Sequence, residues 1–353
     1  MKIAIDILAS TELSGGMRLH ATEIIKSWSA DYPLDRLIII GPKWSQTEFR
    51  DLKNIKIICW PNENILTRAV GQILITPLVG LLSRTSSVLS LSPIVSLLVP
   101  RRRAFCFQHD WRHKKNPDEF PRIQRFYRKL WEVSARHASY NICISAKTEI
   151  ETKTLVSKTR TIVIPNGGDH ARTWNTNEPG EATWVVTFGH HNNKRPELVI
   201  KGFAQIPVEI RPDALIILGA RGGYAERLLS LAGSYGLSES IRLPGFVEER
   251  EYQRLVSGAK VVVLASSDEG FGLPVAEATY FGIPAVVTSD SGLDEIFSGL
   301  YTAEPTPEDL GLQLTNALED VRSKKIRDQG TLNTWSDTVS RTRNLLVHEN
   351  ANV

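Results

Sequence analysis

The sequence predicts an α/β protein built from two doubly wound, Rossmann-like domains. Short runs rich in Val, Ile and Leu alternate with longer amphipathic segments along the whole chain. This alternation is typical of parallel sheets covered by helices. The 353 residues are enough for two domains of ordinary size. Because one set of alternating elements occurs in each half, we expect one parallel sheet in each domain.

The expected elements follow from these apolar runs and from the amphipathic segments between them. Strands are expected at residues 2–7, 37–40, 55–59, 88–91, 104–108 and 140–144 in the first half, and at 183–188, 214–218, 240–243, 260–265 and 285–288 in the second. The clearest helices are expected at residues 18–29, 121–138, 196–205, 224–235, 249–257 and 335–347.

A turn-forming segment marks the expected boundary between the domains. Residues 164–169 read Ile-Pro-Asn-Gly-Gly-Asp, a composition that favours a turn over the interior of a helix or strand. We therefore assign residues 1–166 to an N-terminal domain and residues 167–334 to a C-terminal domain. The last residues, 335–353, are expected to form a helix that returns to the first domain.

Composition narrows the class of protein. Hydrophobic residues make up 42% and charged residues 23%, as in soluble globular proteins. The N-terminal residues read as a strand and not as a signal peptide, because Asp6 interrupts the apolar run. The three cysteines, Cys59, Cys106 and Cys143, lack zinc-site spacing and are expected to be free thiols in a reducing cytosol. A cytoplasmic location follows from these two points.

The first half is also unusually basic and apolar. Residues 101–129 contain ten Lys or Arg and three Asp or Glu, so the local charge is +7 while the whole chain carries +3. Such a stretch fits an anionic partner, namely a lipid headgroup, a diphosphate-linked acceptor or nucleic acid, or else is a solvated basic helix. Residues 69–99 hold two apolar runs, each shorter than a bilayer span, which favour the core or a peripheral membrane contact.

The most informative motif lies between two predicted strands of the second half. Glu269 and Glu277 flank the turn Gly-Phe-Gly-Leu-Pro, and Pro274 suits the first position of a helix. Glu269 then lies at the carboxyl end of a strand, where open α/β sheets bind ligands. Helix amides at this edge suit an anion, whereas a glutamate suits neighbouring hydroxyls. Because a glutamate does not suit a phosphate, the motif favours a polyol such as ribose or a sugar.

The segment EGFGLPVAEA resembles the signature of retaining GT-B glycosyltransferases of family 4, the glycosyl transferases group 1. The resemblance implies two Rossmann-like domains facing across a cleft. It also implies that Glu269 lies beside the transferred sugar, that Glu277 holds the ribose, and that Phe271, Gly272 and Leu273 belong to the donor-binding turn. A nucleotide-diphosphate sugar would be the co-substrate, with no other cofactor.

Further segments resemble the same family in colinear order. Gly16 lies in a glycine pair before a predicted helix, where backbone amides can approach a phosphate. His109, in QHDW, matches the histidine near the reacting sugar. Lys194 and Arg195 follow a strand and would bind the diphosphate, although the spacing departs from the family pattern by about one residue. Phe246 and Val247 match the segment whose backbone reads the base.

Together these features predict a metal-independent retaining hexosyltransferase in which His109, Glu269 and Lys194 are catalytic. The sequence has no Asp-x-Asp motif and no G-x-x-x-x-G-K-[ST] loop, and we expect no metal site and no bound nucleic acid. The expected acceptor is a glycan or a lipid-linked glycan in surface polysaccharide assembly. An anionic membrane surface is a further expected partner, with peripheral attachment at the inner face of the cytoplasmic membrane. The alternatives are a non-catalytic nucleotide-sugar-binding protein and a GT-B isomerase or phosphorylase.

Overall fold

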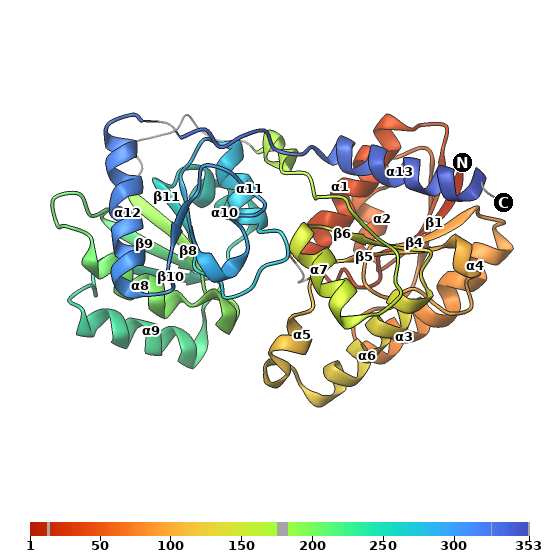
Figure 1. Ribbon diagram of the computed structural model, residues 1–353, viewed down its shortest axis with the longest axis horizontal. Helices are drawn as coiled ribbons and strands as arrows, with labels where there is room; N and C mark the ends of the chain where they lie inside the picture. The colour runs from red at the N-terminus through yellow and green to blue at the C-terminus, as the bar shows by residue number, and fades with distance from the viewer. Residues whose placement is uncertain (13–14, 175–182, 326, 352–353) are drawn as a thin grey trace. The chain divides into compact units, whose positions relative to one another are not determined.

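The computed structural model describes residues 1–12, 15–174, 183–325 and 327–351 (Figure 1). The chain divides into two compact units. Unit 1 contains Met1–Gly167 and Asn333–Val353, and unit 2 contains Gly168–Leu332. The division between the units falls one residue after the predicted boundary at 166/167.

Unit 1 is built on a seven-stranded sheet in which every neighbouring pair of strands is parallel. The strand order is β3-β2-β1-β4-β5-β6-β7. Chain order reverses between β1 and β4, so the carboxyl ends of these two strands border the crevice where such sheets bind ligands. The strands are β1 (Lys2–Asp6), β2 (Arg36–Gly41), β3 (Ile55–Cys59), β4 (Ser87–Ser90), β5 (Ala104–Gln108), β6 (Tyr140–Cys143) and β7 (Thr161–Val163).

The α-helices of unit 1 include one from the far end of the chain. Helix α13 (Trp335–Ala351) packs on α1 (Gly15–Asp31), and the two run side by side in Figure 1. Its first residue, Trp335, is fully buried, and a Cβ atom at Gly167 would lie 2.3 Å from the Trp335 backbone nitrogen. Position 167 must therefore be a glycine, because a side chain there would collide with the start of the last helix. The other α-helices are α2 (Trp44–Glu48), α3 (Ile65–Val70), α4 (Thr76–Leu82), α5 (Arg112–Lys115), α6 (Arg122–His137) and α7 (Ala146–Leu155).

One helical stretch of unit 1 is unusually apolar. Helices α3 and α4 are joined by a π-helical turn, Gly71–Ile75, into a continuous stretch, Ile65–Leu82. Its 18 residues have a mean hydropathy of 1.7, and by length and composition alone it could cross a membrane. Only 33% of this window is buried. The buried side includes contacts of α4 with β1 and β4. The exposed side carries leucines whose side chains are exposed to solvent in the described structure, namely Leu66, Leu74, Leu78, Leu81 and Leu82.

Unit 2 has a six-stranded, all-parallel sheet with the order β10-β9-β8-β11-β12-β13. Its switch point lies between β8 and β11, and a buried apolar core covers the sheet. The strands are β8 (Trp184–Phe188), β9 (Ala214–Leu218), β10 (Ile241–Gly245), β11 (Val261–Leu264), β12 (Ala285–Thr288) and β13 (Tyr301–Ala303). The α-helices are α8 (Pro196–Gln205), α9 (Gly222–Ser234), α10 (Glu249–Ser257), α11 (Leu273–Tyr280) and α12 (Pro307–Arg322).

The prediction of two Rossmann-like α/β units is confirmed by these two parallel sheets. All eleven predicted strands are present within two residues of their expected ends. The sequence analysis missed β7 and β13, which are edge strands of three residues each, and it predicted no helix at α2, α3, α4, α5, α7 or α12. Edge strands are paired on one side only, so they need neither the length nor the apolar run of a central strand.

Candidate functional site

Lys194, Arg195 and Glu269 lie on the two loops that leave the switch point of unit 2. The loop after β8 ends in a short 3-10 turn, Asn192–Lys194, just before α8. The loop after β11 carries Glu269 and leads into α11. Because β8 and β11 are parallel neighbours, both loops leave the same edge of the sheet. Residues 75 positions apart in the sequence are thereby brought together.

Lys194 and Glu269 form an ion pair between these loops. The Lys194 ammonium donates a hydrogen bond to Glu269 Oε1, and the two side chains are only 10% and 13% exposed. Asn193 fastens the loops together, because its Nδ2 donates to the Asp268 carbonyl (3.1 Å) and its own carbonyl accepts from the Ser267 N–H (2.9 Å). Water screens such a pair less than it screens a surface pair. Two of the three predicted catalytic residues are thus in direct contact.

Glu277 lies in the second turn of α11 and is 3% exposed. Its Oε1 is 3.0 Å from His170 Nε2, and its Oε2 accepts a hydrogen bond of 2.6 Å from the Tyr252 hydroxyl. Burial and the charge of Glu277 raise the pKa of Tyr252 well above its usual value, so this phenol keeps its proton and donates a hydrogen bond. Each carboxylate oxygen has a second lone-pair direction. Glu277 is therefore held in one orientation and retains the capacity to accept from hydroxyls.

The turn before α11 requires glycine at one position. Gly272 has φ +84°, and a Cβ there would lie 2.5 Å from Leu293 Cδ2. No side chain caps the N-terminus of α11, whose first residue is Leu273. Phe271 is only 5% exposed and packs on Phe297, with ring centroids 5.4 Å apart. The side chain of Phe271 therefore belongs to the core, and its place in the donor-binding turn stays a prediction.

The guanidinium of Arg195 forms hydrogen bonds within unit 2. Its Nε donates to the Ala265 carbonyl (2.7 Å), and its two terminal nitrogens bind the Asp290 carboxylate at 2.6 and 2.9 Å. A further bond reaches Thr288 Oγ1 at 2.9 Å. Four of the five N–H groups of the guanidinium are thereby used. In this structure Arg195 holds the β8 and β12 loops together, and its sharing of the diphosphate with Lys194 stays a prediction.

The predicted base-reading segment follows β10. Phe246 is 59% exposed, and the Arg221 guanidinium lies 4.2 Å from the centre of its ring. Val247 is partly exposed. The β9 and β10 ends are joined by a hydrogen bond of 2.7 Å from the Gly219 N–H to the Gly245 carbonyl. Arg221 was not singled out from the sequence, although it follows a predicted strand in the same way as Lys194.

In unit 1, His109 directly follows β5 and is a neutral side chain. Its Nε2 is 3.1 Å from the Leu91 carbonyl, which can only accept, so Nε2 carries the proton and Nδ1 is an acceptor. Burial lowers the pKa of His109 below its usual value. Its ring meets the edge of His20 with centroids 4.6 Å apart. The geometry suits hydrogen bonding by Nδ1 and leaves His109 without a positive charge.

His20 packs against His109 and was not singled out from the sequence. Its Nδ1 is 2.9 Å from Asn166 Oδ1, and burial lowers its pKa well below the usual value. Its Nε2 is shielded from solvent with no hydrogen-bond partner within the part of the chain that the structure describes. Gly16 lies nearby in the chain, exposed in the first turn of α1, whereas the neighbouring Ser14 is outside the described residues.

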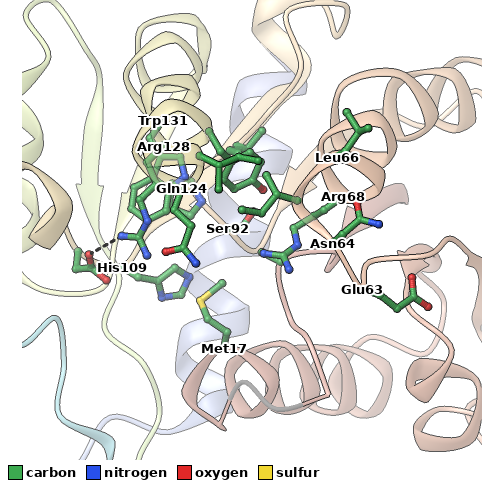
Figure 2. Close-up of a pocket in the computed structure, with 17 residues that line it drawn as sticks. Met17, Glu63, Asn64, Leu66, Arg68, Ser92, His109, Gln124, Arg128 and Trp131 are labelled. Carbon is green, nitrogen blue, oxygen red and sulfur yellow. Dashed lines mark ion pairs between the residues drawn. The ribbon is translucent and has the colours of Figure 1, made fainter. Parts of the chain in front are cut away.

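A cavity of about 610 Å³ lies at the switch point of the unit 1 sheet (Figure 2). Its walls come from the loops after β1, β4 and β5 and from helices α3 and α6. His109 lines it, with Met17 at the start of α1. Within the described ranges, no group of three or more His, Cys, Asp or Glu side chains is arranged as a metal site.

The match to a known family model lies within unit 2. Residues 174–331 match the sequence model of the family described as Glycosyl transferases group 1. Over 145 residues the chain is 29% identical to the O-antigen chain mannosyltransferase B of Escherichia coli. That alignment covers 40% of this chain and 37% of the relative, so the chain spans little more than a third of the relative's length.

Similarity of structure extends over the whole chain. Sucrose-phosphate synthase from Thermosynechococcus elongatus aligns with a TM-score of 0.70 at 17% identity, covering 100% of both chains. Anabaena HepE, solved in complex with UDP and glucose, aligns with a TM-score of 0.66 at 16% identity, covering 100% of this chain and 98% of that one. The fold-class prediction is thereby confirmed. This chain has the GT-B fold, and its residues 174–331 match the Glycosyl transferases group 1 family.

Proposed function

We propose that this protein is a retaining glycosyltransferase that moves a hexose from a nucleotide-diphosphate sugar, bound by unit 2, to an acceptor hydroxyl bound by unit 1. The observation that carries the proposal is the ion pair of Lys194 with Glu269, at the same sheet edge as the buried Glu277. A cation suits a diphosphate, and two carboxylates suit the hydroxyls of a hexose and a ribose. The match of residues 174–331 to the Glycosyl transferases group 1 family supports the same reading.

In this proposal Lys194 stabilises the departing diphosphate. Its ammonium is held by Glu269 in a site that is about nine-tenths shielded from water, where a fixed charge acts more strongly than in bulk solvent. The start of α11 adds the backbone N–H of Leu273 and the positive end of the helix dipole, since Pro274 has no N–H and the Val275 and Ala276 N–H groups donate to the Gly272 carbonyl. Metal independence is part of the proposal, because the sequence lacks an Asp-x-Asp motif and offers these groups for the same charge.

Glu269 and Glu277 would divide the hydroxyls of the donor between them. Glu269 would accept from the hexose, close to the leaving group that Lys194 holds. Glu277 would accept from the ribose, with its orientation fixed by His170 and Tyr252. The exposed ring of Phe246, under the Arg221 guanidinium, would lie beside the base. The HepE structure, which contains UDP and glucose, supports a donor of this chemical class.

The reaction exchanges one bond for another at the anomeric carbon. The bond from this carbon to the β-phosphate oxygen breaks, and the electron pair leaves with the nucleoside diphosphate. The acceptor oxygen bonds to the same face of the sugar, which retains the configuration, and its proton passes to a β-phosphate oxygen. His109 Nδ1 would accept a hydrogen bond from a sugar hydroxyl, a role that needs the neutral ring described above.

For the biological role we propose surface polysaccharide assembly on a glycan or lipid-linked acceptor. The E. coli relative carries an O-antigen function in its name, which supports this choice. We further propose a cytoplasmic protein that attaches peripherally to an anionic membrane through unit 1. The support is the exposed apolar side of Ile65–Leu82, together with α6, which contacts α3 and exposes Ile123, Phe126, Arg122 and Lys129.

The test is a donor screen followed by an acceptor-dependent assay. Thermal unfolding is measured with UDP-, GDP-, ADP- and dTDP-sugars, because a ligand raises the midpoint according to its affinity. With the donor that stabilises the protein, release of nucleoside diphosphate is followed with and without a mixture of glycan acceptors. Release that depends on the acceptor is expected. Binding without release would indicate the non-catalytic alternative, and a rearranged sugar or transfer to inorganic phosphate would indicate an isomerase or a phosphorylase.

A further inference from the structure

The cavity of unit 1 contains two arginines that face it from different helices. Arg68 comes from α3 and Arg128 from α6, and Figure 2 shows them on opposite sides with His109 and Met17 between them. The position at the switch point of a parallel sheet is one where ligands bind. The residues that line the cavity include both apolar and charged side chains, so it fits a ligand of mixed chemistry.

Each guanidinium keeps one shielded nitrogen without a hydrogen-bond partner in the described part of the chain. Arg68 donates a bond of 3.3 Å to the Asn62 carbonyl and interacts with the Tyr127 hydroxyl, while its Nε is shielded from solvent and has no partner there. Arg128 Nη1 is shielded in the same way, and its nearest carboxylate oxygen, Asp110 Oδ1, is 4.0 Å away, beyond hydrogen-bond distance. Buried donors without partners are unfavourable, and a bound acceptor oxygen would satisfy them.

The position of Arg128 is fixed by aromatic rings. Its guanidinium lies 4.1 Å from the centre of the Phe120 ring and 4.6 Å from that of Trp131. The side chain is 22% exposed. Stacking of this kind leaves the in-plane N–H groups of the guanidinium directed at a ligand. Arg128 is therefore already held in place before a ligand arrives.

Two arginines on opposite sides favour a tetrahedral anion over a planar one. A carboxylate presents its lone pairs in one plane, which suits one guanidinium side-on. A phosphate presents oxygens in several directions and can accept from both sides at once. The carboxylates around the cavity compete weakly, since Glu63 is exposed and Asp110 already accepts a bond of 3.0 Å from the Arg112 N–H. The favoured ligand group is a phosphate ester or diphosphate.

The rest of such a ligand would meet an apolar rim. Leu66 and Ile123 line the cavity and are both exposed. Leu66 opens the apolar helical stretch Ile65–Leu82, and Ile123 is in the first turn of α6. A phosphate attached to a lipid could lay its chain on this rim, whereas a soluble sugar phosphate would leave it uncovered. Both sources share the same phosphate chemistry.

We propose that this cavity is the acceptor site and that it takes a phosphorylated acceptor, whose phosphate or diphosphate binds to Arg68 and Arg128. The description of the ligand as an acceptor rests on the proposed function, whereas the phosphate site itself does not depend on catalysis. It deepens that function by naming the chemical class of the acceptor.

The test measures binding directly. The wild-type protein is titrated calorimetrically with pyrophosphate, glucose 1-phosphate, farnesyl diphosphate and, as the neutral probe, glucose. We expect the three phosphorylated probes to bind and glucose not to bind. Arg68→Gln and Arg128→Gln should each weaken phosphate binding at least tenfold. Arg125→Gln, on the same helix but outside the cavity, should change it less than twofold. Farnesyl diphosphate binding much more tightly than pyrophosphate would assign a lipid source, and similar affinities a soluble one.

Two controls separate this site from the donor site. All titrations are repeated in the Lys194→Gln variant, which removes the diphosphate-binding cation proposed for unit 2. Phosphate binding that disappears in Lys194→Gln and persists in Arg68→Gln would overturn the inference, as would equal binding of glucose. Donor binding by the Arg68→Gln variant should be unchanged. If the phosphorylated probes do not bind to the cavity of unit 1, the proposed function therefore still stands. If Arg128→Gln does not fold, Arg128→Lys and Arg68→Gln decide the outcome.

Discussion

Lys194 and Glu269, on loops that follow adjacent parallel strands, form an ion pair at the switch point of the unit 2 sheet. Each was selected from the sequence for a different reason, Lys194 for a diphosphate and Glu269 for a sugar. Their contact brings the expected diphosphate-binding group and the expected sugar-binding group next to each other. A sugar diphosphate has the same two groups joined through a single oxygen, which is why this contact supports a donor site.

The ion pair should be measurable as a coupling energy. We expect Lys194→Gln and Glu269→Gln to destabilise unit 2 less in combination than the sum of the single variants, with a coupling of about 0.5–3 kcal/mol. The reason is that either single variant leaves the other charge in a poorly hydrated site. Chemical denaturation of the four proteins measures it. Additive effects would show that the two charges do not interact in solution.

Glu277 should govern donor affinity. Glu277→Ala removes the proposed ribose acceptor and should weaken nucleotide-sugar binding by about 10–100-fold, since hydrogen bonds to charged groups contribute about 1.5–3 kcal/mol. Tyr252→Phe is the matched control, because it removes one bond to Glu277 and keeps the carboxylate. It should lower stability and change donor affinity much less. Equal losses of affinity in the two variants would point to a purely structural role for Glu277.

His109 should act as a neutral group. Burial holds its pKa below the usual value of 6.5, so the neutral ring predominates above that pH. We therefore expect kcat/KM between pH 6.5 and 8 to show no ionisation that belongs to His109. His109→Gln should lower turnover by about tenfold, the loss expected for one hydrogen bond of about 1.4 kcal/mol. An ionisation in that range that vanishes in His109→Gln would refute the neutral assignment.

Asp6 should make stability fall as the pH rises. Burial raises its pKa from 3.8 to about 6, so the folded protein holds this proton more tightly than the unfolded chain. The stabilising contribution is complete below about pH 4 and is lost as the pH rises through about 6. By pH 7.5 the loss should reach up to roughly 3 kcal/mol relative to Asp6→Asn.

The experiment for Asp6 compares the free energy of unfolding at pH 4 and pH 7.5. Asp6→Asn stays neutral at both values and should gain stability over the wild type only at the higher pH. Asp51→Asn, at an exposed position, should follow the wild type. A wild type and Asp6→Asn that differ by the same amount at both values would rule out a protonated Asp6.

Unit 1 should bind anionic vesicles. We expect co-sedimentation with phosphatidylglycerol vesicles at low salt, and a loss of at least tenfold in the variant with Leu78, Leu81 and Leu82 changed to Ser. Full burial of each leucine in lipid contributes roughly 1.5–3 kcal/mol. The control is Leu312→Ser on α12 of unit 2, whose side chain is also exposed, at 54%, but which should have no effect. No sedimentation of the wild type would argue against membrane attachment.

The fold was predictable because its central strands are encoded locally. Runs such as Val261–Leu264 are buried on both faces and consist of β-branched and other apolar residues, so the sequence itself marks them. The edge strand Thr161–Val163 lacks this signal. The positions of Lys194 and Glu269 at the carboxyl edge were predictable for the same reason, since each directly follows such a run.

The partners of the candidate residues were not predictable. His170 and Tyr252 contact Glu277 from outside its strand-turn-helix segment. No spacing in the sequence predicts either contact. The contacts of Arg195 were not predictable either. Its type and position suit a phosphate, but Asp290, 95 residues further along the chain, occupies it. Such pairings depend on the register between neighbouring strands, which is set by the whole sheet.

The central claim, a nucleotide-diphosphate-sugar site around Lys194 and Glu269, is tested most directly by calorimetric titration of wild type and Lys194→Gln with the stabilising nucleotide sugar. The account predicts saturable one-to-one binding to the wild type, and an affinity lower by at least tenfold in Lys194→Gln. Lys201→Gln, on the neighbouring helix α8, should bind like the wild type. Affinity in Lys194→Gln equal to that of the wild type, or no binding by any of the four classes of nucleotide sugar, would contradict it.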